Sequence, residues 1–291
     1  MRTRFIFVGN RRFVLQEMQK SGIDLVAVIA IAGTHLERDL ERGELEGLLG
    51  YSTVRSKAEL LNLLAHTPFD VLVSNGCPYI LPISQLPPAS YVNIHPSCLP
   101  NLRGVDPVIG SVLYARDAGA TCHVMDDGID TGPIISQVRI PYTDDLDVTT
   151  LYQLSFVAEQ RAFRQALEKD FVPQYSQVTC LNDIYYSRSP ADRAITFREP
   201  NELLMRKIKA FNNRAQGCEF IVNGDVFRVY EATRMHNPFL TEILNEIDDG
   251  IVAFSYENSV IFRKDGEILR FMDIVSSAGS SLSVGDQLFQ A

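Results

Sequence analysis

The sequence lacks any run of the roughly 18 apolar residues that a membrane-spanning helix requires, so no membrane segment is predicted. Its first residues, M-R-T-R-F-I-F-V-G-N-R-R-F, become charged too early and are apolar over too short a stretch for a signal peptide. The five cysteines are odd in number and form no C-x-x-C pair, which is typical of reduced thiols. These absences predict a cytoplasmic protein that has no membrane partner.

An excess of basic residues is also missing. The chain of 291 residues has 27 Lys and Arg against 36 Asp and Glu, a formal net charge of −9. Residues 201–291 alone carry 9 basic and 13 acidic residues. Nucleic-acid-binding proteins normally show a basic patch or stripe. We therefore expect no nucleic-acid partner, and a tRNA-binding module is disfavoured.

The composition is otherwise that of a globular protein, with 46% hydrophobic and 22% charged residues. In the first half of the chain, apolar segments alternate with segments of helical periodicity. Strands are predicted at 5–8, 25–30 and 69–73, and helices at 11–20 and 56–66. Continuous apolar strands between helices predict a mostly parallel sheet covered on both faces, a Rossmann-like α/β domain.

Two motifs with polar side chains follow this alternation. The first, N-I-H-P-S-C-L-P-N-L-R-G, begins at Asn93, and the second, G-A-T-C-H-V-M-D-D-G-I-D-T-G, ends at Gly132. Asn93 and His95 are two residues apart on a predicted strand, so their side chains share one face. Asp130 lies in a turn between glycines, which permit sharp bends near a ligand. An amide, an imidazole and a carboxylate suit a catalytic centre, although the spacing alone is equally typical of structural turns.

Together the two motifs resemble the formyltransferase family that uses 10-formyl-tetrahydrofolate, which includes glycinamide ribonucleotide, methionyl-tRNA and amino-sugar formyltransferases. The resemblance implies that Asn93, His95 and Asp130 are catalytic, that 10-formyl-tetrahydrofolate is the co-substrate, and that no metal is needed. The family loop usually reads S-L-L-P where this chain has Ser97-Cys98-Leu99-Pro100. We expect this change to be tolerated, and we do not expect Cys98 to be a nucleophile.

These residue types fit the implied chemistry, in which an amine attacks the formyl carbon and negative charge builds on the formyl oxygen. Hydrogen-bond donors held at that oxygen lower the barrier, and Asn93 and His95 are the expected pair. Asp130 is expected to orient the imidazole, to favour its protonated form, and to move a proton from the attacking ammonium towards N10 of the folate.

The resemblance also implies a folate pocket beyond the carboxyl ends of the strands, where open sheets bind their ligands. The turn after the strand at 69–73 lies in that position, although by itself it is also typical of an ordinary loop. The residues implied to contact folate are Tyr79, Ile80 and Leu81 on one wall and Asp126, Asp127, Gly128 and Ile129 on the other.

Three further segments are predicted to bind the second substrate. Asn10 and Arg11 follow the first strand, where backbone N–H groups can meet a phosphate, although a simple turn is as compatible with the sequence. Ser97, Arg103 and Gly104 belong to an irregular polar loop of the kind that carries function. The stretch Y-Y-S-R-S-P-A-D-R-A-I resembles an Arg-x-Pro-x-Asp-x-x-Ile segment of amino-sugar formyltransferases. The resemblance implies that Arg188 faces the nucleotide, and Tyr186 beside it is predicted to take part.

The remaining segments complete a two-domain prediction. A helix at 105–118, strands at 120–125 and 134–140 and a long helix at 148–168 close a catalytic domain at 1–180. On the strand at 120–125, His123 alternates with buried positions, which predicts a structural role. Residues 181–200 are the expected linker. A helix at 201–212 and short strands with an Asn223-Gly224 turn predict a small β-barrel (OB-like) domain at 201–291, which resembles the C-terminal domain of methionyl-tRNA and some sugar formyltransferases.

The sequence therefore predicts an N-formyltransferase acting on the primary amine of a dTDP- or UDP-linked amino deoxy sugar, for bacterial surface polysaccharide (O-antigen) synthesis. Pairing of C-terminal strands would make it a homodimer. Three alternatives stay open: a methionyl-tRNA formyltransferase, a formyl-folate hydrolase, and a folate-binding module without enzymatic activity.

Overall fold

The structure, a computed structural model, describes residues 2–45, 47, 48 and 50–288. The chain divides into two compact units. The first unit comprises Met1–Pro107, Asp117–Pro141 and Gln153–Tyr186, and the second comprises Val108–Arg116, Tyr142–Tyr152 and Ser187–Ala291. None of the helices in the described ranges combines the length and the hydropathy needed to cross a membrane.

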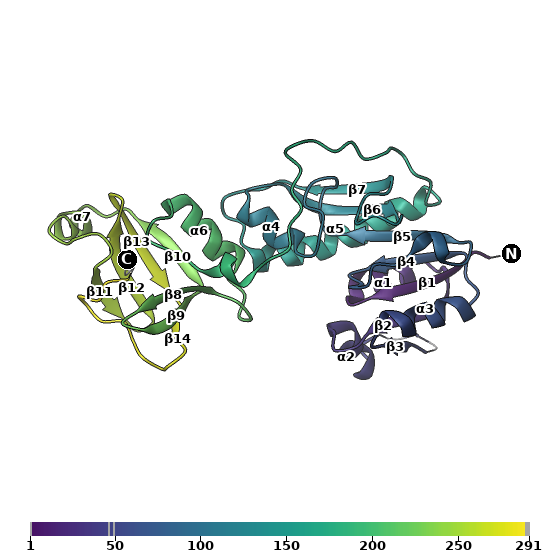
Figure 1. The fold of residues 1–291 in the computed structure, drawn as a ribbon, viewed down its shortest axis with the longest axis horizontal. Helices are drawn as coiled ribbons and strands as arrows, with labels where there is room; N and C mark the ends of the chain where they lie inside the picture. Colours follow the sequence, from purple (N-terminus) through teal and green to yellow (C-terminus); the bar gives the residue numbers. More distant parts are fainter. Residues whose placement is uncertain (1, 46, 49, 289–291) are drawn as a thin grey trace. The chain divides into compact units, whose positions relative to one another are not determined.

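The first unit is built on a seven-stranded sheet with the strand order β3-β2-β1-β4-β5-β6-β7 (Figure 1). The first five strands in this order pair in parallel, and β6 and β7 are antiparallel to their neighbours. This confirms the predicted Rossmann-like, mostly parallel sheet. The strands are β1 (Arg4–Gly9), β2 (Asp24–Ile31), β3 (Ser52–Val54), β4 (Val71–Asn75), β5 (Ser90–His95), β6 (Ala118–Val124) and β7 (Ile134–Ile140).

Helices cover both faces of this sheet because alternate strand residues point to opposite sides. On β1, Phe5 and Phe7 pack with side chains of α1 and α5, while Ile6 and Val8 pack with Leu60 and other side chains of α3. The helical segments between the strands are α1 (Arg12–Lys20), α2 (His35–Glu41), α3 (Lys57–His66), η1 (Ile83–Gln85), α4 (Pro107–Leu113) and α5 (Val148–Glu168).

The carboxyl ends of β1 and β4 approach each other closely. The backbone N–H of Asn10 donates to the Asn75 carbonyl at 3.2 Å. Gly76 has a φ of +73°, and a Cβ there would lie 2.1 Å from Asn10 Oδ1. Only glycine tolerates both this backbone conformation and this crowding. The sequence Asn75-Gly76 therefore brings two turns together at one edge of the sheet.

The second unit contains two antiparallel sheets, with the orders β10-β13-β12-β11 and β14-β9-β8. The predicted β-rich C-terminal region is thus confirmed, and its described strands form two sheets of four and three strands, while their closure into a barrel stays a prediction. Asn223 and Gly224 join β8 to β9 with positive φ values of 52° and 86°, as the predicted hairpin requires. The elements are η2 (Pro190–Arg193), α6 (Asn201–Ala210), β8 (Cys218–Val222), β9 (Asp225–Val229), β10 (Glu231–Met235), α7 (Pro238–Leu244), β11 (Val252–Tyr256), β12 (Ser259–Lys264), β13 (Glu267–Met272) and β14 (Val275–Ser276).

Several predicted elements differ from the observed ones. The helix predicted at 105–118 is wrong at both ends, because α4 spans only Pro107–Leu113 and Ala115 has a φ of +50° that a helix cannot continue through. The elements α2, β3, β10, α7 and β14 were not predicted. They are short, and a periodic pattern over so few residues is hard to distinguish from a loop.

Candidate active site

A cavity of about 320 Å³ lies in the first unit at the carboxyl ends of β1, β4 and β5. Ligands of α/β sheets bind beyond the carboxyl ends of strands, and this volume lies at the lower end of the range of small-molecule sites. Its lining comes from the turns after β1 and β4, the end of β5, and the segment between β6 and β7. The residues are Asn10, Arg11, Ser74, Gly76–Leu81, 93–96, Gly104, Val105, Pro107, His123, Met125, Asp126, Gly128–Asp130 and Tyr185.

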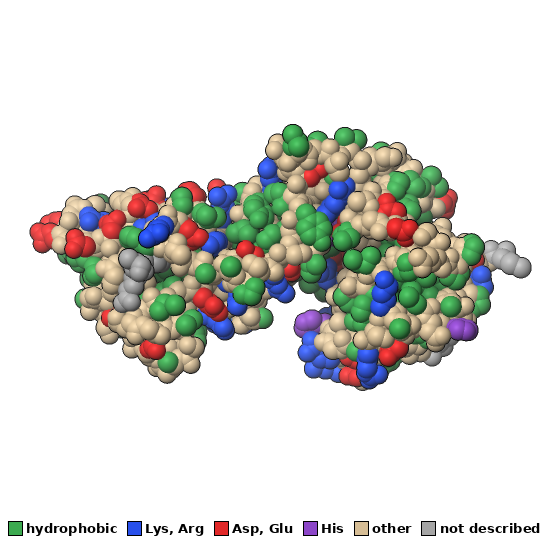
Figure 2. All heavy atoms as spheres, viewed as in Figure 1, with side chains coloured by type: hydrophobic (Ala, Val, Ile, Leu, Met, Phe, Trp, Pro, Cys, Tyr) green, Lys and Arg blue, Asp and Glu red, His purple; other side chains and the backbone are tan. Residues whose placement is uncertain are grey.

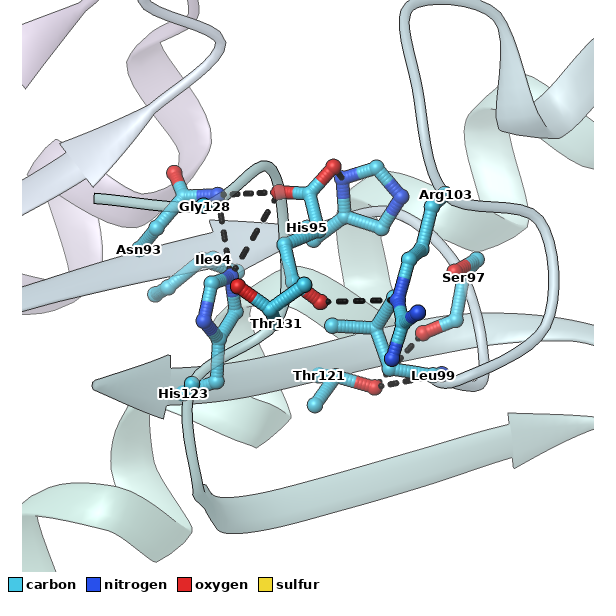
Figure 3. Close-up of polar contacts among 12 residues, drawn as sticks. Asn93, Ile94, His95, Ser97, Leu99, Arg103, Thr121, His123, Gly128 and Thr131 are labelled. Atoms are coloured by element: carbon cyan, nitrogen blue, oxygen red, sulfur yellow. Dashed lines mark hydrogen bonds and ion pairs between the residues drawn. The ribbon is translucent and has the colours of Figure 1, made fainter. Parts of the chain in front are cut away.

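Asn93 and His95 project from the end of β5 towards this cavity. Val92 and Ile94 of the same strand pack into the core on the α5 side, so the period-two prediction that Asn93 and His95 share the other face is confirmed. His95 is buried, and its Nε2–H donates to the Leu102 carbonyl at 2.9 Å. This bond fixes the ring and leaves Nδ1 3.5 Å from Asp130 Oδ2. Figure 3 shows Asn93, His95 and His123 gathered around that carboxylate.

The turn that carries Asp130 is clamped from two sides. Arg103 Nε donates to the Asp130 carbonyl at 3.1 Å, and the Gln177 amide donates to the same oxygen at 2.9 Å. Gln177 also donates to Gly132 and accepts from Arg103. These bonds hold Asp130 in a left-handed conformation, φ 53°, which is costly for a residue with a Cβ. The strain and the clamp together set the carboxylate against the histidines.

Charge in this cluster is governed by burial and by the carboxylate. Burial lowers the pKa of His95 from its ordinary value of 6.5, and this effect outweighs the opposite effect of Asp130. Burial alone would raise the pKa of Asp130, but His95, His123 and the Gly104 N–H lower it to about 2. The Asp130 carboxyl is therefore ionised at neutral pH. As expected, Asp130 favours the protonated form of His95 by raising its pKa, but burial has the larger effect in the opposite direction.

His123 belongs to this cluster, which sequence reasoning missed. It lies on β6 directly opposite Asn93, and its Nε2 is 3.3 Å from Asn93 Nδ2 and 3.6 Å from Asp130 Oδ1. Its Nδ1–H donates to the Val124 carbonyl at 2.8 Å. Alternation along β6 indicated only a buried position, and the antiparallel pairing that sets His123 beside Asn93 has no signal in local sequence.

The arrangement can accept a proton. Nδ1 of His95 and Nε2 of His123 both face the Asp130 carboxylate, and the other nitrogen of each ring donates to a backbone carbonyl. The Asn93 amide holds this group through long contacts of 3.3 and 3.4 Å, so its hydrogens can turn to a ligand oxygen at little cost. The site thus combines a hydrogen-bond donor with an acceptor cluster for a proton.

The two segments implied to bind folate lie on the walls of the same cavity. Tyr79, Ile80 and Leu81 line it after β4, and Asp126, Gly128 and Ile129 line it after β6. Asp127 does not line the cavity. Its Oδ1 accepts from the Ser84 backbone at 3.1 Å and so ties the second segment to η1. Contact of these residues with folate stays a prediction.

The residues predicted to bind the second substrate are not all brought together. Asn10, Arg11 and Gly104 line the cavity. Ser97 is fully buried and donates to the Asn101 carbonyl, Arg103 is used in the clamp, and Tyr186 is buried. It is Tyr185 that reaches the cavity and lies half exposed there. Arg188 is exposed in the second unit, and its contact with a nucleotide stays a prediction.

Residues 17–167, just over half of the chain, match the sequence profile of Formyl_trans_N, the formyl transferase domain. The matched range contains Asn93, His95, His123 and Asp130. The chain belongs to the formyl transferase family. The prediction of a formyltransferase of this family is thereby confirmed, and the cavity around Asp130 is the candidate formyl-transfer site.

Sequence relatives of this formyl transferase are named methionyl-tRNA formyltransferases. The methionyl-tRNA formyltransferase of Janthinobacterium sp. (strain Marseille) is 29% identical over 234 residues, which cover 78% of this chain and 71% of the relative. The methionyl-tRNA formyltransferase of Burkholderia orbicola (strain MC0-3) is 33% identical over 165 residues. In that comparison the chain spans about half the length of the relative.

Several solved structures with the same fold are named as sugar N-formyltransferases. The N-formyltransferase of Helicobacter canadensis, in complex with folinic acid and dTDP-3-aminofucose, superposes with a TM-score of 0.69 at 19% identity. The alignment covers 94% of this chain and 99% of that one. At this identity the likeness establishes the fold across both units of the formyl transferase, and the substrate is a separate question.

Proposed function

We propose that this chain transfers the formyl group of 10-formyl-tetrahydrofolate to the primary amine of a dTDP- or UDP-linked amino deoxy sugar, in the synthesis of a bacterial surface polysaccharide. The observation that carries the proposal is the cluster of Asn93, His95 and Asp130 in the lining of a cavity whose two walls are the segments implied to bind folate. The Helicobacter neighbour, which was crystallised with folinic acid and a dTDP-linked amino sugar, supports both substrates.

In the proposed reaction, a bond forms between the amine nitrogen and the formyl carbon, and the bond from that carbon to N10 of the folate breaks. The Asn93 amide donates to the formyl oxygen as it gains negative charge. A single such donor is worth about 10²- to 10³-fold in rate. His95 becomes a second donor only after its Nδ1 has bound a proton.

The amine must lose a proton and N10 must gain one. Asp130 is ionised and faces ring nitrogens of His95 and His123, so the proton released by the attacking amine is shared within this cluster. Asp130 then passes it towards N10. General acid-base catalysis of this kind contributes roughly 10²- to 10⁴-fold.

The net charge of −9 favours a small substrate over the large polyanion tRNA. In Figure 2 acidic and basic side chains are interspersed on the face in view, and acidic ones gather around α7. Exposed Glu242, Glu246 and Asp248 lie on and after that helix. Methionyl-tRNA formyltransferase is the second candidate, because the sequence relatives carry that name.

The test is formyl transfer from 10-formyl-tetrahydrofolate across a panel of dTDP- and UDP-linked 3-amino and 4-amino deoxy sugars, with methionyl-tRNA in parallel. Turnover with one sugar nucleotide and none with tRNA is the expected result. Turnover with tRNA alone would contradict the proposal, and tRNA binding with a steep salt dependence would identify the second candidate. Release of formate without any amine would instead indicate a hydrolase.

The predicted role of Arg188 is tested in the same assay. Arg188→Ala is expected to raise KM for the sugar nucleotide and to leave KM for the folate unchanged, because a guanidinium suits a diphosphate through paired hydrogen bonds. An unchanged KM for the sugar nucleotide would show that this assignment is wrong.

A further inference from the structure

A second charged group is buried next to the cavity and takes no part in the chemistry above. Glu159 lies on α5 with its side chain fully buried, and its Oε1 accepts from Nη1 of Arg11. Arg11 follows β1, lines the cavity and is 23% exposed. The pair therefore connects the core of the first unit to the cavity wall.

Arg11 is held by α5 from two directions. Its guanidinium lies 5.7 Å from the centre of the Phe156 ring, one turn before Glu159 on the same helix face. Glu159 contacts Arg11 through one guanidinium nitrogen. A guanidinium has five N–H donors in a fixed fork, so the remaining donors are available to a group in the cavity. A side chain fixed before binding loses less entropy when a ligand arrives.

The surroundings of Glu159 are poorly satisfied for a purely structural ion pair. Three buried oxygens, Glu159 Oε2, Asn10 Oδ1 and Asn75 Oδ1, accept no hydrogen bond from the part of the chain that the structure describes. They belong to neighbouring residues, because Asn75 contacts both Glu159 and the backbone of Asn10. A buried ion pair often stabilises a fold less than apolar side chains of the same size would. Buried polar atoms without hydrogen bonds are unfavourable for stability, and departures of this kind are expected at functional sites.

We propose that Glu159 is a positioning residue that holds the Arg11 guanidinium towards an anionic oxygen group of a substrate. The inference rests on the proposed function, whose two substrates both carry such a group: a phosphate on the sugar nucleotide and a carboxylate on the glutamate tail of the folate. Glu159 itself does not touch the substrate and acts through Arg11.

A second ion pair, between α5 and the α1 helix that begins directly after Arg11, offers a matched control. Arg164 of α5 donates through Nε to Glu17 of α1 at 2.8 Å, and the Glu17 side chain is buried. Neither residue lines the cavity. Loss of this pair perturbs the α1–α5 contact without changing Arg11.

The experiment measures binding of dTDP and of folinic acid by calorimetry, together with kcat, both KM values and the melting temperature. Glu159→Leu is expected to raise Kd and KM about 10-fold for whichever probe carries the bound anion, as for a lost charge-assisted hydrogen bond. The probe whose binding weakens identifies which of the two substrates carries the anionic group that Arg11 binds. Glu159→Gln keeps an oxygen for Arg11 and is expected to recover most of the loss. Arg164→Leu is expected to lower the melting temperature and leave both Kd values unchanged.

A double-mutant cycle separates positioning from folding. If Glu159 acts through Arg11, adding Glu159→Leu to Arg11→Ala produces no further rise in Kd. Additive effects, or a folded Glu159→Leu protein with both Kd values unchanged, would overturn the inference. If Glu159→Leu does not fold, Glu159→Asp withdraws the carboxylate by one methylene and carries the same expectation in the same cycle. Wild-type protein that binds neither probe would instead contradict the proposed function, and the inference with it.

Discussion

Two groups of buried polar side chains, one in each unit, are bonded very differently. In the second unit, Lys264 is fully buried, and its ammonium donates to the Glu199 carbonyl at 2.8 Å, pairs with Asp265 and lies 5.1 Å from the centre of the Phe197 ring. In the first unit, the side-chain contacts among Asn93, His95, His123 and Asp130 are 3.3 to 3.6 Å long.

The difference separates a polar group that stabilises the fold from one that is kept ready for a ligand. An ammonium has three donors, and Lys264 directs its own to close partners. The side-chain contacts within the first-unit cluster are long, so its best hydrogen bonds are still to be made. Catalytic hydrogen bonds are often long without substrate and tighten in the complex.

The largest effect that tests this comparison is expected for Asp130→Asn. An amide cannot accept and return a proton, so kcat should fall by about 10³-fold or more, and the circular dichroism spectrum should stay native. Steady-state turnover with the best sugar nucleotide measures it. Turnover in a folded variant within a few-fold of wild type would remove Asp130 from the mechanism.

The converse result is expected for Lys264→Met. The variant leaves the part-buried Glu199 carbonyl without its donor, which costs about 1 kcal/mol of unfolding free energy, while kcat well below the melting temperature should be unchanged. Urea unfolding and turnover, measured on the same preparation, check both parts. Loss of turnover in a variant as stable as the wild type would show that Lys264 serves the reaction and not the stability of the fold.

A smaller effect is expected from pH. Because burial lowers the pKa of His95 below its unfolded value of 6.5, the folded protein binds fewer protons there than the unfolded chain, so stability falls as the pH drops below 6.5. The loss grows as the pH falls further below that value. Urea unfolding at pH 7 and 5.5 should show a wild-type loss that His95→Gln lacks. Asp130, with its pKa lowered to about 2 from 3.8, adds a separate loss only between those two values.

Equal acid sensitivity in wild type and His95→Gln would mean that His95 is not the group that resists protonation in the fold.

The smallest effect is expected for Cys98→Ala. Burial raises the pKa of Cys98 to about 11, and its Sγ–H donates to the Ala118 carbonyl at 3.1 Å. A thiol in this state is a poor nucleophile, so kcat/KM should stay within about 3-fold of wild type, the size of a packing change alone. A loss comparable to that of Asp130→Asn would place a covalent step at Cys98.

The fold of the first unit could be read largely from local patterns. Apolar runs such as Phe5–Val8 gave the buried parallel strands, and the helix predicted at 148–168 coincides with α5. Asn93 and His95 were placed on one face by the two-residue period alone. Failures came where the signal was short, as with α2 and β3, or where a backbone turn ended a helical pattern, as at Ala115.

The sequence by itself determined the family of this protein and predicted its reacting groups, because an amide, an imidazole and a carboxylate stand in two recognisable motifs. Only the tertiary structure decided how they are held and charged. The pairing of β5 with β6 set His123 beside Asn93, the clamp from Gln177 fixed Asp130 from 47 residues away, and α5 placed Glu159 under Arg11 from 148 residues away. Contacts across such separations leave no periodic trace in the chain, and burial, which sets the pKa of His95, exists only once the chain has folded.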